Sequence, residues 1–453
     1  STVCPICTGM PGTLPVVNRR AVEYALRVGL ALECEINPAS IFARKNYFYP
    51  DLPKGYQISQ YELPLAVNGR LLIQTSQGEC NIRIRRAHLE EDAGKLTHVS
   101  EGGQSYSLVD LNRAGVPLLE IVSEPDLHSA EEVRAYAMAL RSLLRYLGVN
   151  SGDMQKGVLR IEPNISIRPF GSTELGTRTE VKNLNSFRAL ERAVDYEILR
   201  QSELLRQGRR VVQETLGWDE ARGATFSQRS KEEAHDYRYF PEPDLPPLVV
   251  DPEWVAEIRN TLPELPAARF HRFQARYGLN AYDAGVLTAE RAVADYFEQT
   301  VAAAPSATPK TAANWITGDL FGLLNQAGLD IQAGRVTPQA LAGLIDLVVK
   351  GEINQSTAKA VLGEMFASGE PAAEIVERGG LRQVSDSQAV SELVKRVLAE
   401  NPEQVAAYLS GKDNLSRWLF GQVMRLAQGK ANPQILQHEL NAQLAALKGK
   451  PQG

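Results

Sequence analysis

Proline crowding near the middle of the chain separates two stretches of different character. Prolines stand at positions 241, 243, 246, 247 and 252, and this density disrupts regular structure because proline has no backbone N–H and restricts the residue before it. Before these prolines, strand-like alternation is interspersed with helix patterns, whereas beyond about residue 258 the sequence is helical in pattern and rich in alanine. The pattern predicts an α+β region followed by all-α structure.

Length and composition narrow the class of protein. At roughly 150 residues per domain, 453 residues suggest about three domains. The longest apolar runs, such as residues 341–349, are too short to cross a membrane, so we expect no membrane partner. Four cysteines do not form a disulfide framework, which favours a reducing cytoplasm. A net charge of −5 argues against a generic nucleic-acid binder, which is usually basic.

Local signals place several elements in the first region. We expect helices after the caps Asn18 and Ser129, and a further helix that starts near Asn185 and Ser186; Ser129 forms a capping box with Glu132, and Gly148 ends the helix that Ser129 begins. Period-two alternation predicts strands at residues 81–86, 158–162 and 164–168. The sequence has no P-loop, G-x-G-x-x-G, G-x-S-x-G or H-E-x-x-H motif, so a nucleotide site would be neither P-loop nor Rossmann.

The densest ionisable cluster is H-L-E-E-D-A-G-K at residues 88–95. Adjacent carboxylates with an imidazole can hold Mg²⁺, which prefers oxygen ligands and keeps phosphates and waters in its shell, and the lysine could neutralise a phosphate. The cluster follows the predicted strand at 81–86, where sites are commonly built. The alternative is a solvated charged turn.

A second cluster interleaves basic and aromatic residues at 44–51 and 54–61. Such a pattern suits contact with a nucleotide or an RNA end through charge and stacking, although a buried tyrosine-rich strand would look the same. At residues 110–126, charged side chains interrupt an apolar run, so they either pair with one another, which is slightly favoured, or line a polar cavity. Cys4 and Cys7 have the spacing of half a zinc site or of a plain turn with two inert thiols.

Seven motifs in order closely resemble one family over nearly the whole chain. They are PGTLPVVN (11–18), RKNYFYPD (44–51), GYQISQ (55–60), HLEEDAGK (88–95), SLVDLNR (107–113), KNLNSF (182–187) and DYRYFPEPD (236–244). Together they resemble the B component of the aspartyl/glutamyl-tRNA amidotransferases, the GatB family. Several eight-residue blocks in sequence are far more specific than any single short motif.

The resemblance implies a reaction and its participants. In this family an amidase (A) component, the GatB component and a small C component convert Asp or Glu mischarged on tRNA-Asn or tRNA-Gln into the amide. The amidase releases ammonia from glutamine, GatB uses ATP and Mg²⁺ to phosphorylate the side-chain carboxylate, and ammonia then displaces phosphate. The chain would thus belong to a C–N-forming ligase with glutamine as amide donor (EC 6.3.5.-). The cognate aminoacyl-tRNA synthetase is a further candidate partner.

The resemblance also implies a domain division. Residues 1–258 would form a cradle-like kinase and transamidase domain, residues 259–375 a helical domain, and residues 376–453 a small all-α tail resembling YqeY proteins that contacts the tRNA. From Lys412 to Gly453, six Lys/Arg and two Asp/Glu leave a charge of +4. Positive charge placed locally makes tRNA binding compatible with the acidic whole, and the acidic balance predicts weak indiscriminate RNA binding.

Roles for individual residues follow from matching the motifs of the family. The catalytic candidates are Arg44, Lys45, His88 and Glu91, and we expect Arg44 and Lys45 beside the reacting carboxylate or phosphates. The candidates for binding nucleotide or substrate are Tyr47, Tyr49, Asp92, Lys95 and Arg113. The candidates for an ammonia path are Glu120, Lys182 and Asn183, with Arg113 lining the same path. The metal candidates are Glu90 and Glu91 for Mg²⁺ and Cys4 and Cys7 for Zn²⁺.

Two elements of the family pattern are missing from this sequence. They are an N-terminal V-G-L-E-x-H-V strand that carries further metal ligands, and the upstream cysteine pair that joins the C-x-x-C in zinc-containing members. We expect that residues precede Ser1. Without that strand, one alternative is a non-catalytic tRNA-binding scaffold. Another is a zinc-ribbon nucleic-acid module, which a single C-x-x-C disfavours.

Overall fold

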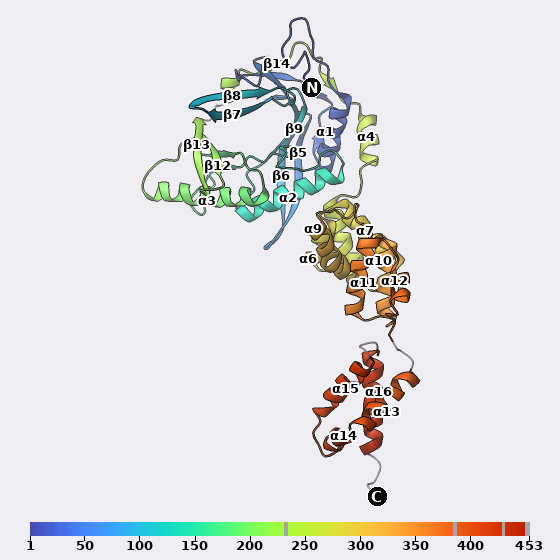
Figure 1. The fold of residues 1–453 in the computed structure, drawn as a ribbon. Helices are drawn as coiled ribbons and strands as arrows, with labels where there is room; N and C mark the ends of the chain where they lie inside the picture. Colours follow the sequence, from blue (N-terminus) through green and yellow to red (C-terminus); the bar gives the residue numbers. More distant parts are fainter. Residues whose placement is uncertain (231–233, 384–386, 428–430, 449–453) are drawn as a thin grey trace. The chain divides into compact units, whose positions relative to one another are not determined.

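The computed structural model describes residues 1–230, 234–383, 387–427 and 431–448. The chain divides into two compact units, Ser1–Arg269 and Phe270–Gly453. The first contains sheets and helices, and the described part of the second is helical (Figure 1). The predicted order, an α+β region followed by all-α structure, is therefore confirmed. None of the described helices is long and apolar enough to span a bilayer.

A four-stranded antiparallel sheet forms the centre of the first unit. Its strand order is β1 (Glu35–Ile36), β5 (Ala66–Thr75), β6 (Gly78–Glu91) and β9 (Pro117–Ser123). Alternation along β6 points Ile82 and Ile84 into a core that is shared with α1 (Arg19–Ala31) and α2 (Ala130–Tyr146). Burial of these aliphatic side chains holds the two helices against the sheet.

The predicted helix caps at Asn18 and Ser129 are confirmed, but the second half of the capping box is not, because Glu132 Oε2 accepts the N–H of His128 at 2.5 Å instead of that of Ser129. The Asn18 side chain accepts the backbone N–H of Arg20 at 2.9 Å at the start of α1. The Ser129 hydroxyl accepts the N–H of Glu132 at 3.1 Å at the start of α2, and Gly148 follows that helix with a left-handed φ of 67°. Ser186 caps α3 (Phe187–Arg206) in the same way. Each cap satisfies an N–H that the first helical turn leaves free.

One predicted strand is wrong and another is shorter than expected. No strand forms at residues 158–162, because the backbone N–H groups of Val158 and Leu159 turn back onto the carbonyl of Asp153 at 2.9 and 3.3 Å. Leu159 packs into the core beside α2, so the apolar alternation reflects packing of an irregular segment. At residues 164–168, only β10 (Asn164–Ile165) pairs with a neighbour.

Smaller sheets complete the first unit. A second four-stranded sheet joins β10, β11 (Thr179–Lys182), β12 (Glu214–Asp219) and β13 (Ala224–Ser230) under α3. A third joins β14 (Phe240–Pro241), β3 (Ala43–Asn46) and β4 (Tyr56–Ser59). β15 (Leu248–Val249) pairs with β2 (Ala39–Ser40), and η1 (Ala234–Tyr237) and α4 (Pro252–Asn260) flank these segments.

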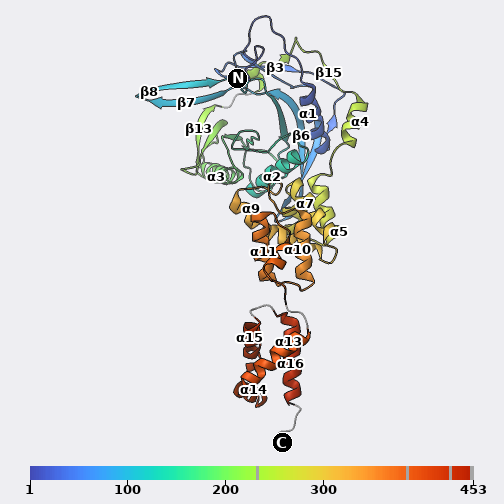
Figure 2. The same cartoon turned by 45° about the vertical axis from the view of Figure 1, so that its right-hand side comes forward.

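A two-stranded ribbon connects β6 to β9. It consists of β7 (Lys95–Glu101) and β8 (Gln104–Asp110), which project from the rest of the first unit (Figures 1 and 2). Glycines with left-handed φ values of 60° and 81°, Gly102 and Gly103, form its tip. Every residue of β8 is exposed.

The described residues of the second unit form two hydrophobic cores. Its helices are the greater part of α5 (Pro266–Tyr277), then α6 (Ala281–Thr288), α7 (Arg291–Ala303), α8 (Pro309–Asn314), the π-helix η2 (Trp315–Leu320), α9 (Phe321–Ala327), α10 (Pro338–Val349), α11 (Gln355–Ser368), α12 (Ala372–Arg378), α13 (Ser387–Glu400), α14 (Pro402–Leu409), α15 (Leu415–Leu426) and α16 (Pro433–Lys448). One core lies within α5–α12 and the other within α13–α16. Division of the chain at 258 and 375 stays a prediction.

Candidate active site

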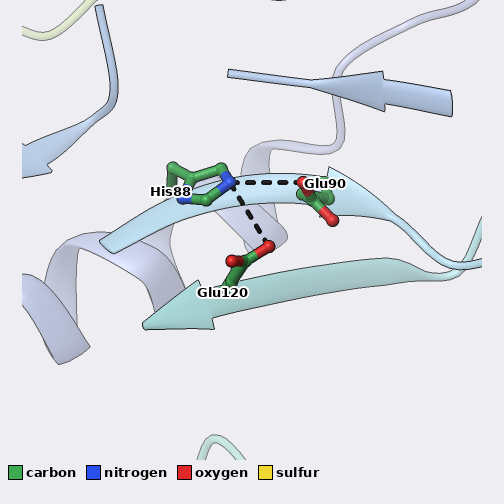
Figure 3. Close-up of side chains that lie close together, drawn as sticks. All are labelled: His88, Glu90 and Glu120. Atoms are coloured by element: carbon green, nitrogen blue, oxygen red, sulfur yellow. Dashed lines mark hydrogen bonds and ion pairs between the residues drawn. The ribbon is translucent and has the colours of Figure 1, made fainter. Parts of the chain in front are cut away.

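Three side chains that could bind a metal ion meet where β6 and β9 pair. His88 and Glu90 lie two residues apart on one face of β6, and Glu120 stands directly opposite His88 in the register with β9. The His88 Nε2 atom is 3.2 Å from Glu90 Oε1 and 3.7 Å from Glu120 Oε2 (Figure 3). Among the described residues, this is the one group of three His, Cys, Asp or Glu whose ligand atoms all lie within 4.8 Å. We call it the His88 cluster.

The His88 cluster is closed on one side and open on the other. His88 is 1% exposed and Glu90 8%, whereas the Glu120 side chain is 45% exposed. The second ring nitrogen of His88, Nδ1, is buried and has no hydrogen-bond partner among the described residues. The two carboxylates are therefore the polar groups that Nε2 faces. The side of Glu120 is the open side of the cluster.

Buried hydrogen-bond donors hold Glu90 in place. Ser59 Oγ donates to Glu90 Oε1 at 2.6 Å, and Gln57 Nε2 donates to Glu90 Oε2 at 3.1 Å, both from β4. Burial alone would raise the pKa of Glu90, but the hydrogen bond to His88 and the charge of Lys45 outweigh it and hold that pKa at about 2. Glu90 is therefore an anion at neutral pH.

Glu120 has a different electrostatic environment. Its pKa is raised, first by loss of hydration and then by the negative charge of Glu90, while His88, Lys45 and Arg86 oppose that rise. Lys45 lies on β3 with its Nζ atom 4.9 Å from the centre of the Tyr237 ring. No carboxylate of the described residues forms an ion pair with Lys45. Within the described residues, the predicted catalytic lysine is thus a cation without a carboxylate partner, and its charge acts on Glu90 and Glu120.

Tyrosines from two distant segments form a wall near Lys45. The Tyr47 hydroxyl donates to Gln57 Oε1 at 3.3 Å, and its ring meets Tyr237 edge to face at 6.0 Å. Tyr237 meets Tyr239 at 6.1 Å, and Tyr239 stacks on Tyr61 at 4.2 Å with an angle of 8°. The predicted role of Tyr47 in binding nucleotide or substrate stays a prediction. We call these four rings the tyrosine wall.

Arg44 differs from Lys45 because it is paired with two carboxylates. Its guanidinium binds both oxygens of Glu242 at 2.7 and 2.8 Å and Asp244 Oδ2 at 3.0 Å, and stacks 4.1 Å above the Tyr56 ring. The hydrogen bonds to Glu242 raise the pKa of Arg44. These ion pairs hold the 236–244 segment, which carries Tyr237, against β3.

Glu91 lies on the other face of β6 from Glu90. There it pairs with Lys54 and accepts the backbone N–H of Ile58 at 2.9 Å. Cys7 lies nearby, and its pKa is raised to about 11, mainly by burial and then by its contact with Cys4. The structure therefore does not bring Glu91 together with His88.

Asp92 anchors the loop between β6 and β7. Its carboxylate pairs with Arg160 at 2.7 Å and with Arg113 at 3.4 Å, and Arg113 also donates to the carbonyl of Ala93 at 3.0 Å. Lys95 begins the exposed ribbon, opposite Asp110. These contacts leave the binding roles of Asp92, Lys95 and Arg113 as predictions.

The remaining candidates lie in other places. Tyr49 is half exposed and lines a cavity of about 490 Å³ formed by residues 48–50 and 52–55. Lys182, at the end of β11, pairs with Glu162 at 2.8 Å, and Asn183 follows with a left-handed φ of 65°. Their predicted role in an ammonia path is not tested by these contacts.

Cys4 and Cys7 are free thiols that face each other. Backbone N–H groups, chiefly that of Cys7, lower the pKa of Cys4. A tetrahedral zinc site needs four ligands, and Cys34 and Cys80 do not join the pair in any three-ligand group among the described residues. Zinc binding therefore stays a prediction.

Gln57, Ser59, Tyr237 and Tyr239 were not among the predicted site residues. All four lie within motifs quoted for the resemblance, at 55–60 and 236–244. A signal was present for two of them, because polar side chains at Gln57 and Ser59 alternate with Ile58 and so face one side of a strand.

Comparison with known proteins defines the class first. Residues 1–256 match the family described as the GatB/GatE catalytic domain, and residues 295–444 match the GatB domain. The first unit, with the His88 cluster on its central sheet, is thus a catalytic domain of the GatB/GatE class.

Curated relatives extend the similarity over the whole chain. The GatB protein of the aspartyl/glutamyl-tRNA(Asn/Gln) amidotransferase of Moorella thermoacetica is 54% identical over 98% of this chain and 92% of its own length. Its counterparts in Myxococcus xanthus and Herpetosiphon aurantiacus are 53% and 52% identical, over 97% and 98% of this chain and 91% and 92% of their lengths. The chain belongs to the GatB family of tRNA-dependent amidotransferases, as its motifs implied.

Proposed function

We propose that this chain activates the side-chain carboxylate of Asp or Glu on mischarged tRNA-Asn or tRNA-Gln with ATP, so that ammonia can form the amide. The observation that supports it is a group of three side chains that could bind a metal ion, on the central sheet of a domain that belongs to the GatB/GatE catalytic class. A free carboxylate is a poor acyl donor because oxide is a poor leaving group. Phosphorylation supplies a good leaving group, and the energy of ATP drives the step.

The donor set of the His88 cluster fits a divalent cation. Ligands at about 2.1 Å in octahedral geometry lie about 3 Å apart when adjacent. Nε2 of His88 lies 3.2 and 3.7 Å from oxygens of Glu90 and Glu120, close to that spacing. Mg²⁺ held by these three side chains would retain waters and phosphate oxygens in its other positions. Bound there, it would neutralise the charge of the triphosphate and align it with the carboxylate.

The protein residues bind, orient and exclude water. Glu90 stays ionised because the hydrogen bond to His88 and the charge of Lys45 outweigh its burial, and Ser59 and Gln57 also donate to it, so Glu90 could hold a cation at neutral pH. Lys45, which has no carboxylate partner among the described residues, would offset the repulsion between a phosphate and a substrate carboxylate. The tyrosine wall beside Lys45 would exclude water that competes with ammonia.

The assembly and location follow from the same proposal. The chain would act with an amidase that supplies ammonia from glutamine, with a small C component and with the mischarged tRNA. Contacts with the cognate synthetase would deliver that tRNA. Because aminoacyl-tRNA is used in translation, the complex would act in the cytoplasm as a ligase of protein biosynthesis.

Glutamine variants of the cluster test the proposal in the complete amidotransferase. Glu90→Gln and Glu120→Gln keep the side-chain shape but remove one cation-binding charge each. We expect each to reduce ATP-dependent amidation with ammonium as donor by about 100-fold or more, while glutamine hydrolysis by the amidase continues. The matched control is Glu124→Gln, because Glu124 follows the same strand but pairs with Arg85 at 2.8 Å on the exposed face.

Two outcomes would contradict the proposal. Near-normal amidation by both variants would show that the His88 cluster has no part in the reaction. Amidation by the unmodified complex in the absence of Mg²⁺ would show that the reaction does not need this cation. Glu91→Gln provides a further comparison, because Glu91 lies on the opposite face of β6 with Lys54.

A further inference from the structure

Three arginines near the end of β6 have different partners. Arg83 pairs with Asp126 at 2.6 Å, and Arg85 pairs with Glu124 at 2.8 Å. Arg86 lies two residues before His88 on the same face of the strand. Among the described residues, no carboxylate forms an ion pair with Arg86. Within that part of the chain, Arg86 is therefore a cation without a protein anion, beside a site that carries two carboxylates.

The guanidinium of Arg86 is held but not satisfied. One Nη atom donates to the Tyr61 carbonyl at 3.2 Å, and the group lies 5.9 Å from the centre of the Tyr61 ring. Its Nε atom is buried and has no hydrogen-bond partner among the described residues. A buried donor without a partner costs free energy, and proteins seldom keep one unless a ligand or water satisfies it.

Arg86 lies on the same face of the sheet as Glu120, because Arg86 stands opposite Val122, two residues after Glu120 along β9. Its charge acts on Glu120, the half-exposed member, and on Tyr239, which stacks on Tyr61. The tyrosine wall therefore supports the guanidinium from one side. Among the described residues, its second Nη group donates no hydrogen bond.

The net charge of the His88 cluster indicates why a further cation such as Arg86 would be needed beside it. A divalent cation bound by the Glu90 and Glu120 carboxylates leaves a net charge near zero, so the loaded cluster alone attracts an anion only weakly. A substrate carboxylate and a phosphoryl group are both negatively charged, and each presents two neighbouring oxygen atoms that accept hydrogen bonds. A guanidinium matches such pairs with two parallel hydrogen bonds, which an ammonium group cannot reproduce.

We propose that Arg86 binds an oxyanion of the substrate, either the carboxylate to be activated or the phosphoryl group that ATP transfers to it, beside Glu120. This inference rests on the proposed function and specifies the residue that recognises the reacting anion. It gives Arg86 the role that the motifs suggested for Arg44, whose guanidinium is already paired with Glu242.

The test compares variants in the complete amidotransferase with ammonium as donor. We expect Arg86→Gln to raise the KM for one substrate or lower kcat by about 10- to 100-fold. Arg86→Lys should recover only part of that loss, because it keeps the charge but not the fork. A raised KM for ATP identifies the phosphoryl group, and a raised KM for the mischarged tRNA identifies the carboxylate. Arg85→Gln is the matched control, because its partner is Glu124, and it should stay within about twofold.

Chemical rescue separates binding from a structural role. We expect millimolar guanidinium ion to restore part of the activity of Arg86→Ala, since the ion can occupy the vacated place beside Tyr61. If Arg86→Gln and Arg86→Lys both amidate normally, or if folded Arg86→Ala is impaired and guanidinium does not rescue it, the inference is wrong. If the unmodified complex shows no ATP-dependent amidation, the proposed function fails instead.

Discussion

Ser59 offers a sharp test of how the site is held together. The side chain is 1% exposed, and its hydroxyl donates a 2.6 Å hydrogen bond to Glu90 Oε1. The same oxygen faces Nε2 of His88 at 3.2 Å. Ser59→Ala removes this donor and leaves the carboxylate, so it perturbs the orientation of one proposed ligand without removing it.

The expected magnitude follows from the remaining contacts. A hydrogen bond to a charged group contributes about 1.5–3 kcal/mol to stability. Gln57 still donates to the other oxygen of Glu90 at 3.1 Å, so we expect the lower end, about 1.5 kcal/mol of unfolding free energy at neutral pH. Loss of a group that orients a metal ligand weakens metal binding by about 10- to 100-fold. For Ser59→Ala we expect roughly tenfold weaker binding.

The assay measures both quantities on the full chain. Urea unfolding gives the stability, and titration with Mn²⁺, followed by its electron paramagnetic resonance signal and competed with Mg²⁺, gives the cation affinity. The matched control is Ser40→Ala, because Ser40 is equally buried and donates to the Leu63 carbonyl at 2.6 Å. Ser40→Ala should lose stability without losing cation affinity. Equal cation affinity in both variants and the unmodified chain would refute the role of Glu90 as a ligand.

Three further predictions concern stability elsewhere in the two units. Burial would raise the pKa of Glu197, but Arg200 and two hydroxyl groups outweigh it and lower that pKa. The free energy that ionised Glu197 contributes to folding should therefore be present above about pH 4.5, the ordinary pKa of a glutamate, and should be lost as pH falls below it. Glu197→Gln should make the free energy of unfolding depend less on pH in this acid range, as measured by unfolding at a series of pH values. Gly69→Ala should destabilise by about 1–3 kcal/mol, measured by urea unfolding, because its Cβ would lie 2.3 Å from Cys34 Sγ. Gly343→Ala, at an exposed position of α10, should instead stabilise by about 0.5–1 kcal/mol by the same measurement, because the added Cβ would meet no atom within 4 Å beyond its chain neighbours and the backbone of its own helix.

Local chemistry explains which parts of the fold could be predicted. The caps Asn18, Ser129 and Ser186 were predictable because each satisfies N–H groups within a few residues of itself. Residues 158–162 misled because apolar alternation also arises when an irregular segment buries one side chain, Leu159, in a core. Local periodicity does not distinguish these two cases.

Long-range pairing explains why the site was predicted only in part. The sequence places His88 and Glu90 close together, and the period of a strand separates Glu90 from Glu91 by face. Glu120 joins them only through the register between β6 and β9. That register could not be predicted from the sequence, because the ribbon of β7 and β8 lies between the two strands in the chain and no tight turn fixes how they pair. Arg44 and Glu242, nearly two hundred residues apart, pair for the same reason. Pairing over such distances depends on the whole core.

The ribbon of β7 and β8 has a consequence for how the chain could be divided. Backbone pairing between β6 and β9, rather than a tight turn, sets the place of Glu120 beside His88. Cleavage between Gly102 and Gly103, at the exposed tip, would leave each ligand on a strand whose pairing partners remain intact. Two fragments produced separately would then be expected to reassemble by complementation. The tip is thus a natural position for splitting the protein into a conditional pair.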